Sequence, residues 1–285
     1  MLTYFQAIIL GIVQGITELF PISSLGHSVI LPRVLGWHVN QKDPFFLIFL
    51  VATHAATAIV LFVFFWKDWK LIISGVIHSL KEREIQNNDS YAKLGWLLII
   101  GTIPAGVIGL LFEDSLKTLF ASPQIVAGIL ILNGLMLLGT EMLRKNRRED
   151  KEKGSDKRIA RIHWIEAVKI GLLQCIALLP GFSRTGATIA GGLFVGLSHE
   201  DAARFSFLLA TPIIGAAALL KLPELATQTG NKNIGPTIVG VLFAGVFAYL
   251  SVKFLTKYFE SKKLFPFGVY CVVIGAIVSL LFLFR

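Results

Sequence analysis

The chain has 285 residues, of which 54% are hydrophobic and only 16% are charged. A soluble domain carries about a quarter charged residues, so this composition excludes an ordinary soluble domain and indicates an integral membrane protein. The net charge of +9 does not indicate a nucleic-acid partner, because the basic residues lie in short linkers between apolar runs, as the positive-inside rule describes for membrane proteins.

Six apolar runs are long enough to cross a bilayer as helices. In chain order they are residues 45–66, 94–112, 124–143, 203–222, 235–256 and 265–284. Two further apolar regions, 4–36 and 165–198, are broken in the middle by Pro21 and by Pro180. Neither half of these regions can span alone, so each is predicted to form a re-entrant helix-loop-helix. The expected fold is all-α, with six spanning helices and two re-entrant segments, about ten helices in all.

The linkers predict the orientation in the membrane. Residues 144–161, RKNRREDKEKGSDKRIAR, form the most polar segment, and their excess of basic residues places it in the cytoplasm. Linkers 67–93 and 257–264 are also basic, whereas 113–123 and 223–234 are not. This alternation puts both termini outside.

The two halves of the chain resemble one another. LFPISSLGH in the first half matches LLPGFSRTGA in the second, and FLVATHAATAI matches FLLATPIIGAA. Each half would hold one re-entrant segment and three spans, and an odd number of spans inverts the second half. We predict a single membrane domain, 1–285, with repeat one at 1–143, the cytoplasmic linker at 144–161 and repeat two at 162–285. Inverted repeats place a site at their interface near the midplane; chance similarity of apolar segments is the alternative.

The first broken region carries an acidic residue at membrane depth. Gln14 and Glu18 are four residues apart and share a helix face. A carboxylate in an apolar run costs about 2.5 to 3.5 kcal/mol on insertion scales, which favours a function as a metal ligand or proton acceptor. The alternative is a glutamate that caps the broken helix.

Ser24 and His27 follow in the same region, three residues apart. A histidine beside a serine in a dry cleft can act as a general base or acid. An isolated pair with this spacing is more often helix capping, and the functional interpretation gains weight only if Glu18 and Arg184 converge on the pair.

The second broken region contains PGFSRTGAT, with an arginine at membrane depth. Arg184 offers a planar fork of donors suited to phosphate oxygens. Ser183, Thr185 and Thr188 add hydroxyls, and Gly181 allows the backbone to approach a ligand closely. A half-helix that begins near Thr185 would direct its free N–H groups to the same place. These features predict a phosphate site; an arginine bound to carbonyl groups of the broken helix is the alternative.

Other polar residues in the apolar runs are interpreted more simply. Thr53 and His54 are expected to be packing or helix-kink residues that could support the site from behind. Glu113 and Asp114 end a span and could bind cations weakly.

QGITE, PISSLGH and PGFSRTGAT together resemble the undecaprenyl-diphosphate phosphatases, also called bacitracin-resistance proteins, and the resemblance covers the whole chain. That family is marked by a Glu-or-Gln, three residues, Glu motif and by a PGxSRSxxT motif. The resemblance implies hydrolysis of undecaprenyl diphosphate to the monophosphate and inorganic phosphate, which recycles the lipid carrier for cell-wall polymers. It also implies a place in the bacterial cytoplasmic membrane, with the site open to the outer, periplasmic face.

The resemblance also implies roles for single residues. They are a metal-associated pair at Gln14 and Glu18, an essential hydroxyl at Ser24, a histidine at His27, and a phosphate-binding Arg184 flanked by Ser183 and Thr188. The implied cofactor is a divalent cation, Mg²⁺ or Ca²⁺, held mainly by Glu18 and the substrate diphosphate. Gln14 stands where many members have glutamate, which would weaken metal binding, and Thr185 replaces the commoner serine.

Two mechanisms stay open at this point. Either Ser24 attacks the terminal phosphorus while His27 handles its proton, or His27 activates water that Ser24 positions. A transporter or flippase for a phosphorylated lipid or another anion is the alternative function, because inverted repeats with broken helices are typical of transporters. The expected partners are undecaprenyl diphosphate and membrane lipid, with no nucleic acid, and a homodimer is allowed.

Overall fold

The structure, a computed structural model, describes residues 2–41, 43–86, 88–112, 122–144, 155–229 and 234–284. Across these ranges the regular secondary structure consists of twelve helices. They are α1 (Tyr4–Thr17), α2 (Ser24–Val34), α3 (Pro44–Phe64), α4 (Trp66–Glu82), α5 (Ser90–Leu111), α7 (Pro123–Leu143), α8 (Ser155–Ile159), α9 (Trp164–Ile176), α10 (Arg184–Phe194), α11 (His199–Thr229), α12 (Ile234–Tyr258) and α13 (Phe265–Leu283). Glu113, Asp114 and most of the predicted 144–161 linker lie outside the described residues.

Six of these helices are long and apolar enough to cross a membrane. They are α3, α5, α7, the His199–Pro223 part of α11, α12 and α13. Each coincides with one of the predicted apolar runs, so the all-α class and the six candidate spans are confirmed. Many of their large apolar side chains are exposed, as expected of helices that face lipid.

The segment predicted as the linker 67–93 is not irregular, which corrects that expectation and the count of about ten helices. Most of it forms α4, which continues from α3 after Phe65. Basic and acidic residues interrupt the apolar pattern of α4, but Trp69, Ile72 and Gly75 recur at helical spacing and are buried. Helix α4 packs against α5, where a Cβ added to Gly75 would lie 2.6 Å from the Ala92 nitrogen. Charge in this segment therefore hid a packed amphipathic helix.

The short helix α8, also not predicted, is held by ion pairs. Arg158 lies 2.8 Å from Asp201, and Arg204 of α11 lies 2.8 Å from Asp156 and 2.9 Å from Asp68 of α4. These pairs tie the end of the central linker to α11 and α4.

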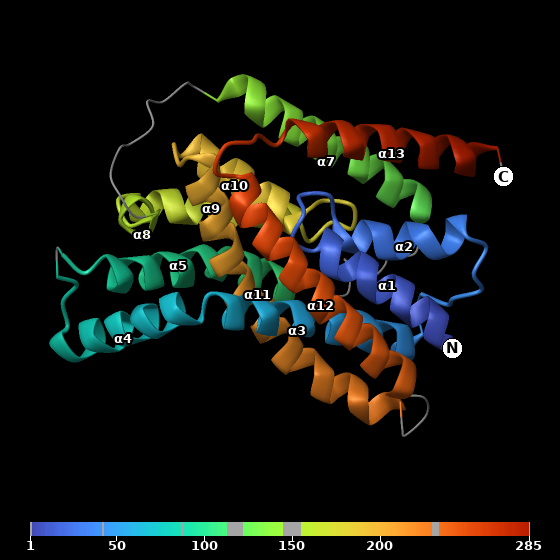
Figure 1. Ribbon diagram of the computed structural model, residues 1–285, viewed down its shortest axis with the longest axis horizontal. Coiled ribbons are helices and arrows are strands. Elements are labelled where there is room, and N and C mark those ends of the chain that lie inside the picture. Colours follow the sequence, from blue (N-terminus) through green and yellow to red (C-terminus); the bar gives the residue numbers. More distant parts are fainter. Residues whose placement is uncertain are drawn as a thin grey trace.

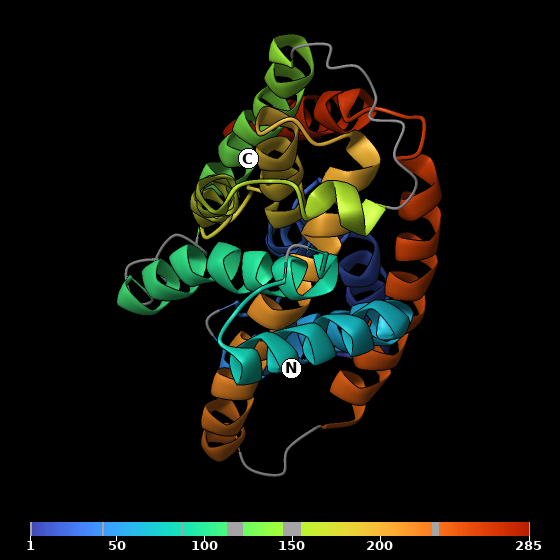
Figure 2. The same ribbon diagram turned by 90° about the vertical axis from the view of Figure 1, so that its left-hand side faces the viewer.

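The two broken regions form helical pairs, α1 with α2 and α9 with α10, in the middle of the molecule. Figures 1 and 2 both place α1 between α7 and α13 on one side and α3 on the other. Helices α1 and α9 have 14 and 13 residues, about 20 Å of helix, which is less than the hydrocarbon core. A Cβ added to Gly26 would lie 3.3 Å from the Gly181 Cα, so the two breaks touch each other.

The first helix of each pair packs through a glycine against a spanning helix. A Cβ added to Gly11 of α1 would lie 2.4 Å from the Gly240 oxygen of α12. A Cβ added to Gly171 of α9 would lie 2.4 Å from the Gly101 oxygen of α5. Both contacts bring backbones so close that any side chain would force the helices apart.

Candidate active site

The two helix breaks present the first residues of α2 and α10. Helix α1 ends at Thr17, and Glu18 is its C-cap. Ser23 then adopts a left-handed backbone conformation with φ of 71°, which costs about 1 to 3 kcal/mol for a residue other than glycine. In the second break, Gly181 has φ of 109°, and a Cβ there would lie 2.6 Å from the Val126 oxygen. Strain and close packing therefore gather where the predicted site lies.

Two serines cap the half-helices in the same way. The Ser23 hydroxyl accepts from Gly26 N–H at 3.2 Å, and the Ser183 hydroxyl accepts from Gly186 N–H at 3.0 Å. Ser24 thus directly follows its cap, as Arg184 does, whereas an alignment on the two prolines would pair Ser24 with Ser183. Counted from the glutamines 14 and 174, both caps come nine residues later, so the prolines alone are out of register.

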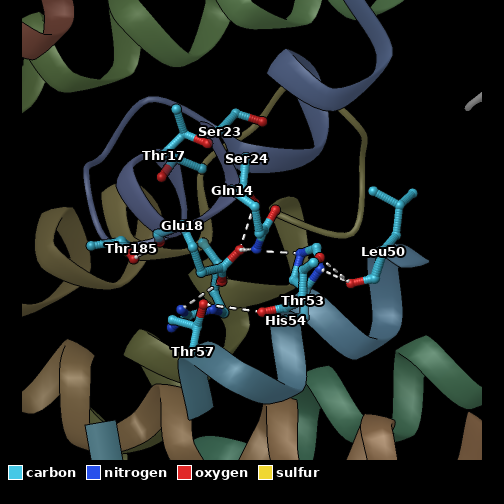
Figure 3. Close-up of polar contacts among 12 residues, drawn as sticks. Gln14, Thr17, Glu18, Ser23, Ser24, Leu50, Thr53, His54, Thr57 and Thr185 are labelled. Carbon is cyan, nitrogen blue, oxygen red and sulfur yellow. Dashed lines mark hydrogen bonds and ion pairs between the residues drawn. The ribbon is translucent and has the colours of Figure 1, made fainter. Parts of the chain in front are cut away.

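The Glu18 carboxylate lies at the centre of the site and is 6% exposed. Its Oε2 atom accepts from Gln14 Nε2 at 3.1 Å and from Ser24 Oγ at 2.5 Å, and it lies 3.1 Å from His54 Nε2. Its Oε1 atom accepts from Arg184 Nη2 at 3.0 Å. Figure 3 shows Gln14 and His54 pointing at this carboxylate from α1 and α3. Glu18 therefore connects the first residues of both half-helices.

These contacts bear on the structural alternatives for the two charged residues, a glutamate that caps the broken helix and an arginine bound to carbonyl groups. The Glu18 carboxylate is bound by side chains rather than by backbone groups of its own helix break. Arg184 is bound by that carboxylate rather than by carbonyl groups. A buried charge is costly unless it is paired and hydrogen-bonded, and here each ion meets the other's need. Glu18 and Arg184 thus form a largely buried ion pair, and the Ser24 hydroxyl donates to its carboxylate.

His54 belongs to this cluster, although its position in a span predicted only packing or support. Its Nδ1 atom is 2.7 Å from the Leu50 carbonyl oxygen and its Nε2 atom faces Glu18. Both neighbours are acceptors, so a proton on each nitrogen satisfies both contacts. The cost of a polar side chain in an apolar run, applied to Glu18, would have singled out His54 as well.

His27 does not join the cluster around Glu18. Its Nδ1 atom is 2.7 Å from the Ser23 carbonyl oxygen, and its Nε2 atom is 2.9 Å from the Tyr270 hydroxyl. Its ring also stacks on the ring of Tyr270, with centroids 5.8 Å apart. Among the described residues it makes no hydrogen bond to Ser24 or Glu18, so the predicted pairing of Ser24 with His27 is absent. Tyr270 of α13 is 38% exposed and was not foreseen from the sequence.

The three hydroxyls predicted to bind phosphate are engaged by the protein. Ser183 caps α10, and Thr185 Oγ1 donates to the Glu18 carbonyl oxygen at 2.9 Å. Thr188 Oγ1 lies 2.5 Å from Ser206 Oγ on α11. These side chains hold the Arg184 half-helix against its neighbours. Their predicted role as direct phosphate ligands remains a prediction.

Unused donors remain at the two half-helix starts. The first N–H groups of a helix have no partner within the helix, and the caps take only those of the third residues. In the hydrogen bonds of the described residues, the N–H groups of Ser24, Leu25, Arg184 and Thr185 find no acceptor. Arg184 Nη1 is also buried without a partner. Unpaired donors at helix N-termini and on a guanidinium are of the kind that binds anions.

A divalent cation fits this site only in part. In the described part of the chain, no group of three or more His, Cys, Asp or Glu side chains is placed to hold a metal ion. The nearby oxygens are those of Glu18 and Ser24, together with Gln14 Oε1, which is buried without a partner. Mg²⁺ and Ca²⁺ take six or more oxygen ligands. The residues present therefore fit a cation that arrives with a diphosphate.

Comparison with known proteins identifies the family. The family model described as Bacitracin resistance protein BacA matches residues 7–277. An undecaprenyl-diphosphatase of Mycolicibacterium paratuberculosis is 44% identical over an alignment of 294 positions, gaps included, that covers 96% of this chain and 95% of that protein. An undecaprenyl-diphosphatase 2 of Chromobacterium violaceum is 43% identical over 281 residues, which cover 97% and 98%. Both matches run almost end to end, and the chain belongs to the bacitracin resistance protein BacA family.

Proposed function

We propose that this protein hydrolyses undecaprenyl diphosphate to undecaprenyl phosphate and inorganic phosphate, and so recycles a lipid carrier of cell-wall synthesis. The observation that carries the proposal is the Glu18 carboxylate, bonded to a hydroxyl on one half-helix and to a guanidinium on the other. A base, a nucleophile and an anion clamp are what phosphoryl transfer requires. The names of the relatives support the same reaction and the same lipid.

In the proposed reaction Ser24 is the nucleophile and Glu18 is its base. The Ser24 hydroxyl already donates to Glu18 Oε2, so its proton passes to that carboxylate as Oγ attacks the terminal phosphorus. The new O–P bond forms as the bond to the bridging oxygen breaks, and undecaprenyl phosphate leaves. Water then attacks the seryl phosphate, and the P–Oγ bond breaks as Oγ takes back the proton held by Glu18. Inorganic phosphate leaves with the oxygen of that water, and the proton that the water releases goes with it. The contacts of His27 with Ser23 and Tyr270 favour Glu18 over His27 as the proton acceptor.

Arg184 and the free N–H groups hold the phosphate oxygens. Arg184 and Ser24 both donate to the Glu18 carboxylate, so the guanidinium lies close to the nucleophile. Among the described residues, its Nη1 atom has no hydrogen-bond partner and could bind a phosphate oxygen. Charge that develops on the phosphoryl oxygens in the transition state would be stabilised by these fixed donors. In the free protein Glu18 takes the place of such an oxygen, so the phosphate must compete with it for Arg184.

A divalent cation is proposed to bind together with the diphosphate, held by Glu18 and Gln14. When bound it would neutralise the diphosphate and the leaving monophosphate.

Purified protein in detergent should release phosphate from undecaprenyl diphosphate, and a chelator should lower that rate strongly, with recovery when Mg²⁺ or Ca²⁺ is restored. A rate that is unchanged by chelator would contradict the cation, and no release with any divalent cation would contradict the hydrolase.

The proposal includes an inverted repeat with two re-entrant helical pairs. The helix caps recur at a spacing of 160 residues. Thr3 and His163 are the N-caps of α1 and α9, each within a capping box, and Ser23 and Ser183 are the N-caps of α2 and α10. The glycine contact of α1 with α12 has a counterpart between α9 and α5, with the partners exchanged between the halves. A two-fold relation between the halves accounts for both observations.

The expected orientation also belongs to the proposal. Figure 1 has both ends of the chain at one end of the molecule, and α4 and α8 at the opposite end. Helix α4 carries Lys67, Lys70 and Lys81, and the linker before α8 is rich in lysine and arginine, which supports a cytoplasmic position for that end. The pair α1 and α2 would then enter from the outer side of a bacterial cytoplasmic membrane, and the site would open there.

A further inference from the structure

A single asparagine on a spanning helix connects the two half-sites. Asn133 lies in α7 and is 0% exposed. Its Nδ2 atom donates to the Pro21 carbonyl oxygen at 3.1 Å, and its Oδ1 atom accepts from Ser183 N–H at 3.0 Å. One amide thus bonds to the first helix break with one end and to the second break with the other.

The surrounding face of α7 is shaped to receive both breaks. The backbone oxygen of Val126 and the side chain of Ile129 lie against Gly181, where a Cβ would come within 2.6 and 2.8 Å of them. One turn beyond Asn133, Leu137 lies against Gly186, at 3.3 Å from a Cβ placed there. Spacings of three and four residues put these positions on one side of α7. Helix α7 therefore supports the second break along several turns, and Asn133 adds the first.

Packing alone does not account for a polar residue here. A leucine has similar bulk and no polar atoms, but it would leave the Pro21 carbonyl and the Ser183 N–H without this partner. Each buried polar group left unpaired costs about 1 to 3 kcal/mol. Only a side chain with a donor and an acceptor in one plane serves both groups. The amide also lies 3.3 Å from Cys271 Sγ on α13.

We propose that Asn133 is a positioning residue for the reaction. It fixes the separation between Ser24 and Arg184, because Pro21 precedes Ser24 by three residues and Ser183 directly precedes Arg184. The nucleophile and the phosphate clamp come from opposite halves of the chain, so their relative placement depends on contacts that bridge the halves. This inference rests on the proposed function.

Two substitutions test it by steady-state phosphate release from undecaprenyl diphosphate. Asn133→Leu should lower kcat about 100-fold, the cost of a displacement near 1 Å, while KM changes little because the lipid still binds. Asn133→Asp should be active at acidic pH, where a neutral carboxyl can donate to Pro21 and accept from Ser183. Its kcat should fall as pH rises, since the introduced carboxylate would face the Pro21 carbonyl oxygen. The titratable group facing this position is the Cys271 thiol.

Thr140→Val is the matched control, because Thr140 is a buried polar residue of α7. In the part of the chain that the structure describes, its hydroxyl bonds only to its own helix, at Met136 O. Its kcat and pH profile should match those of the wild type. The positioning role would be overturned if Asn133→Asp kept the wild-type pH profile, whatever the stability of Asn133→Leu. Absence of phosphate release in the wild type would instead overturn the proposed function.

Discussion

Replacing Arg184 with alanine is expected to lower kcat/KM for phosphate release by about a thousandfold. Helix α10 contributes the Arg184 guanidinium to the Glu18 carboxylate. Its Nη1 atom is buried and has no hydrogen-bond partner among the described residues. Its removal takes away the main charge that would stabilise the transferred phosphoryl group, and it leaves Glu18 with His54 as its remaining basic partner. Arg184→Lys should recover only part of the rate, because an ammonium cannot reproduce the planar fork.

The matched control for this change is Arg204→Ala. Arg204 is also partly buried and paired with carboxylates, at Asp68 and Asp156, but it lies on α11 outside the candidate site. Its loss should lower the thermal midpoint and leave kcat close to that of the wild type. Comparable losses of kcat in both variants would mean that Arg184 acts on stability rather than on phosphate.

Replacing Ser24 with alanine is expected to have the largest effect, a loss of about 10⁴-fold or more in kcat. The variant lacks the oxygen that attacks phosphorus, while Arg184 and the free N–H groups that bind the diphosphate remain. Binding of undecaprenyl diphosphate should therefore be retained, and KM should change little. The measurement is steady-state phosphate release, with lipid binding measured in parallel on the same detergent-purified protein.

Ser28→Ala controls for the loss of a buried hydroxyl on the same helix. Ser28 is one turn after Ser24, and its hydroxyl has no hydrogen-bond partner among the described residues. Its substitution should leave kcat near the wild-type value. If Ser24→Ala kept phosphate release within about tenfold, water rather than Ser24 would be the nucleophile. If it kept release intact but abolished lipid movement, the transport function would gain the support that hydrolysis loses.

Much of the fold could be predicted because lipid leaves few choices. A run of about 20 apolar residues must be a helix, but a proline alone does not break it, since α5 and α11 continue through Pro104 and Pro212. Breaks could be predicted at Pro21 and Pro180 because polar residues and glycine follow both prolines. Helix α4 was not predicted, because its charged residues suggested a linker. Its buried residues, Trp69, Ile72 and Gly75, lie on one face that packs against another helix. Amphipathic periodicity carried the information there, and charge obscured it.

Sequence reasoning predicted only those site residues that adjoin a break in an apolar run. Glu18, Ser24 and Arg184 adjoin the two breaks and do meet in the structure. His54 and Asn133 lie in spanning helices, and the partners that link them to the helix breaks are 36 residues or more away in the sequence. A single polar residue in an apolar run can face lipid, a neighbour or a site, and only the tertiary packing selects among these. The packing also gives the Thr185 and Thr188 hydroxyls partners within the protein, which the sequence did not predict.

The most direct test of the central claim is phosphate release from undecaprenyl diphosphate by Glu18→Gln beside Glu141→Gln. Both glutamates are paired with a histidine, Glu18 with His54 and Glu141 with His199 at 2.7 Å. Only Glu18 contacts Ser24 and Arg184. We expect Glu18→Gln to lose about a thousandfold in kcat, as for a base that must accept the nucleophile's proton, and Glu141→Gln to keep most of its rate. Near-normal release by Glu18→Gln would contradict a reaction centred on this carboxylate.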